Sequence, residues 1–225
     1  DEVELLAGAL AQPDRRSGNQ ILRALAAAHP WIGARQFGGA GAIPLRRPFD
    51  RLAAPGVALL GNAASQVFSA HGSGIGIGLV AARQLADAAL AGHDPGGAAT
   101  TWAYQAAFHR RWGGLLAAYD LFRRATQSLT GDEVDRLMAA GVVGPSNSRA
   151  ALEQRLVLPS PRELPRLLAG LIEAPRLTRR LGKRLARIPL AMALYARYPL
   201  RPSRPALVRW SAKAAGLFGE APDLR

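Results

Sequence analysis

Four glycines stand at every second position, at residues 72, 74, 76 and 78, just before an apolar segment with helical spacing. Glycine costs backbone entropy, so a need for bare backbone is the simplest reason to use it there. The first turn of a helix exposes unpaired amides and carries partial positive charge. We therefore expect these amides to bind an anionic or electron-rich group. A tight strand-to-helix turn, in which the glycines serve packing alone, stays open as an alternative.

A short apolar run, GVALL at residues 56–60, ends at Gly61 and is followed by Asn62, Ala63 and Ala64. This pattern predicts a buried strand that leads into a loop. Asn62 then stands at the carboxyl end of the strand, which is where open α/β sheets bind their ligands.

Two familiar nucleotide-binding patterns do not fit these glycines. The third glycine of G-x-G-x-x-G would fall at Ile77 or Leu79, so the stretch is not a Rossmann fingerprint. Gly182 and Lys183 precede an arginine instead of Ser or Thr, which excludes a P-loop.

Hydrolase and metal chemistry have little support in the sequence. A nucleophilic Ser73 would need the pattern G-x-S-x-G, whereas residues 71 and 75 are His and Ile. The absence of cysteine excludes disulfides, thiolate zinc sites and cysteine nucleophiles. His29, His93 and His109 lack the paired spacing of metal ligands, so we expect no metal site. The catalytic residues stay unknown.

The segment from residue 56 to residue 90 resembles the second flavin-binding motif of FAD-dependent oxidoreductases of the geranylgeranyl reductase and aromatic hydroxylase type. The family pattern is an apolar strand, Gly-Asp-Ala-Ala, seven residues, Gly-x-Gly-Ile and a helix. Residues 43–56 resemble the segment that leads into this strand in the family, and residues 83–86 and 129–141 resemble the reductase branch. The ungapped match runs through Gly61, Ala63, Ala64, Gly72, Gly74 and Ile75.

This resemblance implies FAD as the cofactor. Asn62 replaces the family's acidic residue, which binds a ribityl hydroxyl, and its carbonyl can still accept such a hydrogen bond. The amides of residues 72–75 would face the pyrimidine edge of the flavin ring, where negative charge collects on reduction, and His71 would lie nearby. The implied cofactor-binding residues are Gly61, Asn62, Ala63, Gly72, Ser73, Gly74 and Ile75.

The activity implied by the resemblance is hydride transfer to a double bond of an isoprenoid or other lipophilic substrate, with NAD(P)H or another reductant. A flavin-dependent hydroxylase or halogenase is one alternative, and a cofactor-free protein that binds membranes or a partner is another. The chain begins with Asp and contains no G-x-G-x-x-G. We therefore expect a C-terminal portion that a missing N-terminal half completes.

The composition favours helices, because 49% of the residues are hydrophobic and most of these are Ala and Leu. We predict an α+β chain, predominantly helical: the C-terminal part of an α/β FAD-binding fold, followed by a helical domain. The expected domains are 1–52, the end of a substrate-domain-like region with a helix and short strands; 53–97, the second half of the FAD-binding domain; and 98–225, a helical region with a basic tail.

Helical spacing predicts helices over residues 17–30, 79–92, 102–119, 130–141 and 160–172. The third has a weak point at Gly113 and Gly114, and capping boxes at 130–133 and 160–163 begin the last two. The expected inner faces are Leu79, Ala82, Leu85, Ala86 and Ala89 in the second helix, and Val134, Leu137 and Met138 in the fourth.

The net charge of +13 is concentrated near the C-terminus, because residues 174–219 hold eleven basic residues and no acid. Residues 176–187 have the spacing of a basic amphipathic helix, and 195–205 are predicted to form an extended arm. We expect residues 176–213 to meet an anionic membrane surface, with a solvated helix face as the alternative. Nucleic acid is not expected, because no nucleic-acid motif is present. The expected location is cytoplasmic, peripheral to the inner face of the membrane.

Overall fold

The structure is a computed structural model that describes residues 2–11, 13–139, 149, 152–155, 165, 169, 172 and 175–224. Residues 1–42 and 43–225 form two compact units, and each is described by itself. The helix predicted over 160–172, with its capping box, lies outside the described residues apart from three isolated positions.

The first unit contains helix α1 (Gly18–Ala28), which the helical spacing predicts. Ser17 and Gln20 form a capping box, because each side chain accepts a hydrogen bond from the other residue's backbone amide. The short strands expected between residues 31 and 52 are not formed, and β structure begins at Ala53. Four glycines and two prolines between residues 33 and 48 explain this, because both residue types are unfavourable in strands.

The second unit begins its regular structure with a small hairpin. Strands β1 (Ala53–Ala54) and β2 (Val57–Ala58) pair antiparallel, and Gly56 in the turn between them has φ +76°. The prediction of a buried strand over 56–60 is therefore wrong, since only two residues are in the strand and Val57 is 58% exposed. The Pro-Gly turn reverses the chain direction, and residues 59 and 60 lie outside the strand and lead into the next turn.

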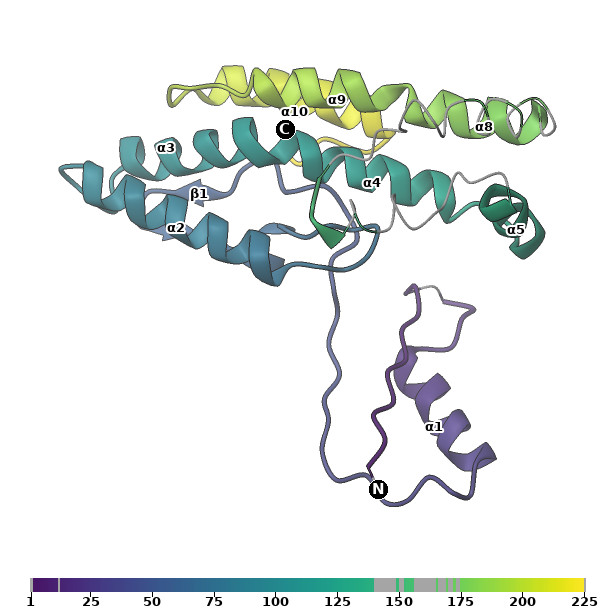
Figure 1. Ribbon diagram of the computed structural model, residues 1–225. Helices are drawn as coiled ribbons and strands as arrows, with labels where there is room; N and C mark the ends of the chain where they lie inside the picture. Colours follow the sequence, from purple (N-terminus) through teal and green to yellow (C-terminus); the bar gives the residue numbers. More distant parts are fainter. Residues whose placement is uncertain are drawn as a thin grey trace. The chain divides into compact units, whose positions relative to one another are not determined.

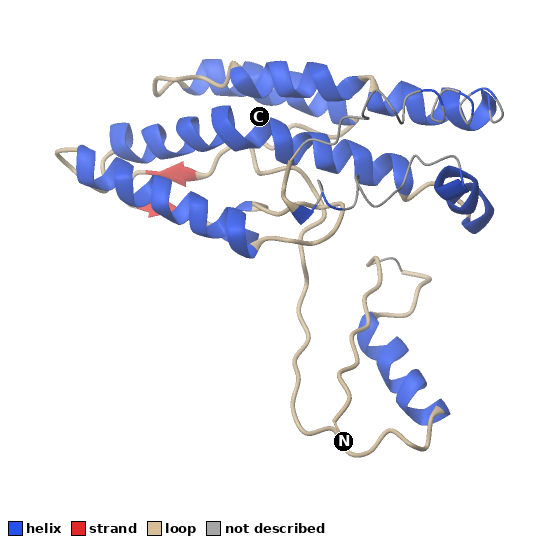
Figure 2. Cartoon of the chain, viewed as in Figure 1, coloured by secondary structure: helices blue, strands red, loops and turns tan. Residues whose placement is uncertain are grey.

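Helices make up most of the described structure, as the composition predicts (Figures 1 and 2). No described helix combines the length and the apolar character needed to cross a membrane. The helices of the second unit are α2 (Ile75–Ala91), α3 (Ala98–Phe108), α4 (Gly114–Thr126), α5 (Gly131–Ala139), α8 (Pro175–Leu185), α9 (Arg187–Ala196) and α10 (Arg204–Phe218).

Helices α3 and α4 are joined by a π-helical turn, His109–Gly113, without a break in the helical path (Figure 1). The predicted weak point at Gly113 and Gly114 is instead a close contact with α9. A Cβ at Gly113 would overlap the ring of Tyr195, and one at Gly114 would lie 3.1 Å from Cα of Met192. Glycine here lets two helix backbones approach each other.

Helix α2 packs on α3, but its inner face agrees with the predicted one only in part, through residues such as Leu85. Ile77 and Ala81 are buried, whereas Leu79 is 68% exposed and Ala86 is also exposed. The helix begins at Ile75, four residues earlier than expected, and its apolar residues surround the axis. Apolar spacing therefore did not distinguish the buried face from the exposed one.

The C-terminal helices differ from the predictions in two places. Thr130 and Glu133 form the predicted capping box at the start of α5, but of the expected inner face only Leu137 is buried. The predicted extended arm at 195–205 is reduced to residues 197–203, because α9 continues to Ala196. Ser203 then caps α10, with Pro205 in its first turn, as is typical of helix starts.

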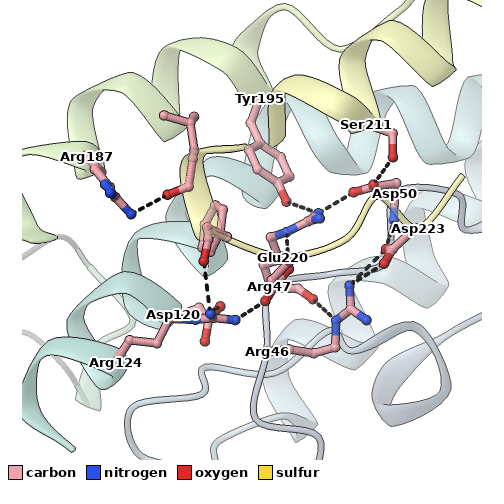
Figure 3. A network of polar contacts seen from close by, with 12 residues as sticks. Arg46, Arg47, Asp50, Asp120, Arg124, Arg187, Tyr195, Ser211, Glu220 and Asp223 are labelled. Atoms are coloured by element: carbon pink, nitrogen blue, oxygen red, sulfur yellow. Dashed lines mark hydrogen bonds and ion pairs between the residues drawn. The ribbon is translucent and has the colours of Figure 1, made fainter. Parts of the chain in front are cut away.

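A buried polar network joins residues 46–50 to the C-terminal helices (Figure 3). The Arg47 side chain is fully buried and forms ion pairs with Asp50 and Glu220. It also donates a hydrogen bond to the hydroxyl of Tyr195. Asp50 in turn accepts a hydrogen bond from the hydroxyl of Ser211 on α10.

His109 is buried beside this network in a group of aromatic rings. Its ring stacks on Tyr198 with centroids 4.3 Å apart, and Trp210 lies 5.7 Å away. Neither ring nitrogen has a hydrogen-bond partner of regular geometry among the described residues, and the nearest polar group is the backbone of Phe49. Burial, together with the charge of Arg47, lowers the pKa of His109 to about 3.

We expect Gly113→Ala to lower the free energy of unfolding by about 1–3 kcal/mol, because the new methyl group would overlap Tyr195. Gly216→Ala is the matched control, since it lies inside α10 with no atom within 4 Å of the added carbon. The control should gain stability, by about 0.5–1 kcal/mol. Urea denaturation followed by circular dichroism measures both, and equal effects would contradict the close helix contact.

We expect His109 to make the protein less stable as the pH falls from about 6.5 toward 3. In this range the unfolded chain binds a proton at this histidine and the folded chain does not, which costs about 1.4 kcal/mol per pH unit. His109→Phe keeps the ring contacts and should remove this contribution to the dependence of the unfolding free energy on pH. Urea midpoints of both proteins between pH 5 and 7 test this, and parallel curves would contradict it.

Candidate functional site

The seven predicted cofactor-binding residues lie on two segments that meet in space. One is the 3-10 turn Gly61–Ala64, which follows β2, and the other is residues 72–75 at the start of α2. A Cβ at Gly74 would lie 3.4 Å from Oδ1 of Asn62, and one at Gly78 would lie 3.8 Å from Cα of Gly61. The glycines therefore allow the turn and the helix start to form one continuous edge.

The 3-10 turn is held by Gln66 and Tyr104. The amide of Gly61, at φ +57°, donates to the side-chain oxygen of Gln66 over 2.8 Å. The side-chain nitrogen of Gln66 donates to the hydroxyl of Tyr104, which donates to the carbonyl of Leu59. Burial raises the pKa of Tyr104 to about 12, so its hydroxyl remains a donor at neutral pH. These hydrogen bonds thus hold the 3-10 turn against α3.

A tight turn then directs the chain into α2. The amides of Phe68 and Gly72 donate to the carbonyls of Ser73 and Phe68, over 2.9 and 2.8 Å. Gly72 has φ +73°, a conformation that side-chain-bearing residues rarely adopt. The sequence therefore needs glycine at 72 to place the start of α2 beside the 3-10 turn.

The first turn of α2 is open to solvent. Gly74 is the N-cap residue, no side chain caps the helix, and no acidic residue stands in its first turn. The positive end of the helix dipole is therefore free to meet an electron-rich group from outside. Gly61, Gly72, Ser73 and Gly74 are half-buried along this edge, whereas Asn62, Ala63 and Ile75 are exposed.

One titratable side chain lies beside this edge. His71 is exposed and stacks on Phe68 with ring centroids 5.6 Å apart. Tyr119 of α4 meets both rings edge-on. Burial raises the pKa of the Tyr119 hydroxyl above its ordinary value. These ring contacts fix the orientation of the His71 side chain beside the turn.

Sequence reasoning missed Gln154, whose side chain lies against the start of α2. Its side-chain nitrogen donates to the hydroxyl of Ser73 over 3.3 Å, and a Cβ at Gly76 would lie 3.4 Å from the same nitrogen. The next residue, Arg155, accepts a hydrogen bond from Tyr119 through its carbonyl. Nothing in the local sequence around 154 indicates this contact.

A cleft of about 450 Å³ lies elsewhere in the second unit. It is formed by residues 51–55 and the first turns of α3 and α10, with Trp102 and Leu207 in its walls. None of the seven predicted residues lines it, so it belongs to a different part of the surface.

Two features of the edge are compatible with the ring and ribityl part of FAD, the group that the resemblance implies. Nothing lies within 4 Å of the position that a Cβ at Gly61 would take, so the backbone there is open to close approach. Asn62 offers an exposed side-chain carbonyl beside the uncapped amides, which suits a hydroxyl group. The sequence has no G-x-G-x-x-G to hold the ADP part.

The similarity of this chain to known proteins is distant. No protein-family model matches the chain. The chain is 27% identical over 168 residues to a protein named digeranylgeranylglycerophospholipid reductase from Sulfolobus acidocaldarius. The match covers 73% of this chain and 37% of that protein. The chain thus spans little more than a third of the length of this relative.

We expect Tyr104→Phe to lower the free energy of unfolding by about 1–3 kcal/mol, because it leaves the buried Gln66 amide without its acceptor. Local protection should fall most at the 3-10 turn. Relative to the unchanged protein, the exchange of the Gly61 amide with solvent should therefore accelerate more than that of amides in α4. Hydrogen exchange measures this. Tyr119→Phe, which removes a different hydroxyl, is the control. Uniform acceleration in both variants would contradict the anchoring role.

Proposed function

We propose that this chain forms the ring side of a flavin site in an FAD-dependent oxidoreductase. The observation that carries the proposal is the uncapped, solvent-open first turn of α2 with the exposed Asn62 beside it. Bound FAD would supply hydride transfer at this edge.

Each part of the edge has its own role in the proposal. The amides of residues 73–75 and the helix dipole stabilise negative charge on a ligand that contacts them, whereas the Gly72 amide already donates to the carbonyl of Phe68. Oδ1 of Asn62 accepts a hydrogen bond from a hydroxyl group of the ligand. Gly61 and Gly72, both at positive φ, shape the backbone so that a flat ring can approach it.

The proposed activity is reduction of double bonds in an isoprenoid or other lipophilic substrate, with NAD(P)H or another reductant as electron source. The relative's name, digeranylgeranylglycerophospholipid reductase, favours a reductase over a hydroxylase or halogenase. An N-terminal half with a nucleotide-binding βαβ unit, in the same chain or another, would hold the ADP part. A cytoplasmic position beside the membrane suits such a substrate.

We expect the chain to bind riboflavin and FAD with affinities within about threefold of each other, because the ADP part finds no recognition pattern here. For the same reason ADP should not compete with riboflavin for binding. Asn62→Asp should tighten riboflavin binding by about fivefold, since a charged acceptor makes a stronger hydrogen bond. Asn62→Ala should weaken binding by a similar factor. Quenching of flavin fluorescence measures each of these affinities.

Asn19→Ala is the matched control, because Asn19 is also exposed and begins a helix in the other unit. It should leave riboflavin binding unchanged. Absence of flavin binding at millimolar riboflavin, or equal effects at positions 19 and 62, would overturn the proposed site and favour the cofactor-free alternative.

A further inference from the structure

Helices α8 and α9 present one continuous stripe of residues to the outside. They follow one another along one side of the helical body, and Ala186 between them keeps helical dihedral angles, φ −60° and ψ −16° (Figure 1). Their inward-facing residues therefore stay in register across the junction. Positions 177, 181, 185, 188, 191 and 195 are among the buried or half-buried ones, and the exposed positions 176, 179, 183, 187, 190, 193 and 197 lie opposite them.

The two halves of this outer stripe differ in chemistry. On α8 the stripe is cationic, with Arg176, Arg179 and Lys183 exposed. On α9 it is apolar, with Leu190 58% exposed and Pro189 and Ala193 exposed beside it. Arg197 and Arg201 restore positive charge beyond α9, where Leu200 is 64% exposed. An apolar strip thus lies between two basic clusters.

The acids of this region do not neutralise the stripe. Glu220 and Asp223 are the acidic residues between 175 and 224, and both turn inward. Glu220 pairs with Arg47 and Arg124, and Asp223 pairs with Arg46 (Figure 3). Each of these two acids is held by an arginine from outside the C-terminal helices. Glu133 of α5 pairs with Arg180, which lies beside the stripe, whereas Arg176, Arg179 and Lys183 form no ion pair among the described residues.

We propose that the outer stripe of α8 and α9 binds the surface of an anionic lipid bilayer. Basic side chains gain from anionic headgroups, and the apolar strip gains from the acyl boundary beneath them. A duplex nucleic acid offers phosphates but no apolar phase, so it would leave Leu190 and Pro189 without a partner. The proposal does not depend on the flavin site, whose test is riboflavin binding.

Sedimentation with vesicles tests the proposal on the full chain. Phosphatidylcholine vesicles with about 30% phosphatidylglycerol should bind the protein, pure phosphatidylcholine vesicles should bind it far more weakly, and 0.5 M salt, chosen as about ten times a low-salt buffer, should release most of it. Equal binding to both vesicles, or binding to neither, would overturn the proposal.

Two variants test the cationic part and the apolar part of the stripe separately. Removing three charges by Arg176→Gln, Arg179→Gln and Lys183→Gln should lower partitioning by about 100-fold, at about fivefold for each charge. Leu190→Gln should lower it by about tenfold without changing the salt dependence. All four side chains are exposed, so unchanged thermal midpoints will show that the variants still fold.

The matched control removes three exposed arginines from the first unit, by Arg15→Gln, Arg16→Gln and Arg23→Gln. It should change partitioning by less than about threefold, because these charges lie outside the stripe. An equal loss in the control would show attraction by net charge alone and overturn the proposal. So would tighter binding to duplex DNA, or to a polyglutamate peptide, than to the anionic vesicles.

Discussion

Burial of the Arg47 side chain is the constraint on which the second unit depends. Taking a guanidinium out of water costs several kcal/mol unless other groups replace its hydration. Its partners here come from three places: Asp50 lies three residues away, Tyr195 lies on α9, and Glu220 follows α10 (Figure 3). Segment 46–50 is irregular, but it can bury this charge only when the C-terminal helices dock against it. A removed partner would leave an uncompensated buried charge.

This constraint extends through α3 to the edge formed by the 3-10 turn and residues 72–75, here called the glycine edge. The hairpin that follows Asp50 is held where the side-chain oxygen of Gln105 accepts the amides of Leu52 and Ala53, over 3.0 and 3.1 Å. The neighbouring Tyr104 bonds Gln66 and thereby fixes the 3-10 turn. Two adjacent residues of α3 thus position both the hairpin and the candidate site. Among the described residues, helices hold the candidate site in place, whereas the sequence predicted that an α/β sheet would do so.

Sequence reasoning succeeded where the information is local and failed where the partners are distant. The capping box at residues 130–133 spans four residues and could be predicted directly, and glycine itself marked the turn before α2, where Gly72 has positive φ. The Arg47–Glu220 pair joins residues 173 positions apart, and Gln154 reaches Ser73 from 81 positions away. The apolar run at 56–60 fits a hairpin as well as a buried strand, because five residues carry too little pattern to separate them.

The glycine edge and the outer stripe use different surfaces of one scaffold. Helix α2 packs on α3, helix α9 packs on α4, and the π-helical turn joins α3 to α4 as one rod. The stripe residues point away from the contact that Gly113 and Gly114 make with α9, so their charges do not enter the packing of that rod. A lipophilic substrate partitions into bilayers, so an enzyme that reduces it gains by staying at a lipid surface. Attachment through a face separate from the glycine edge would leave that edge free to receive the proposed cofactor and substrate.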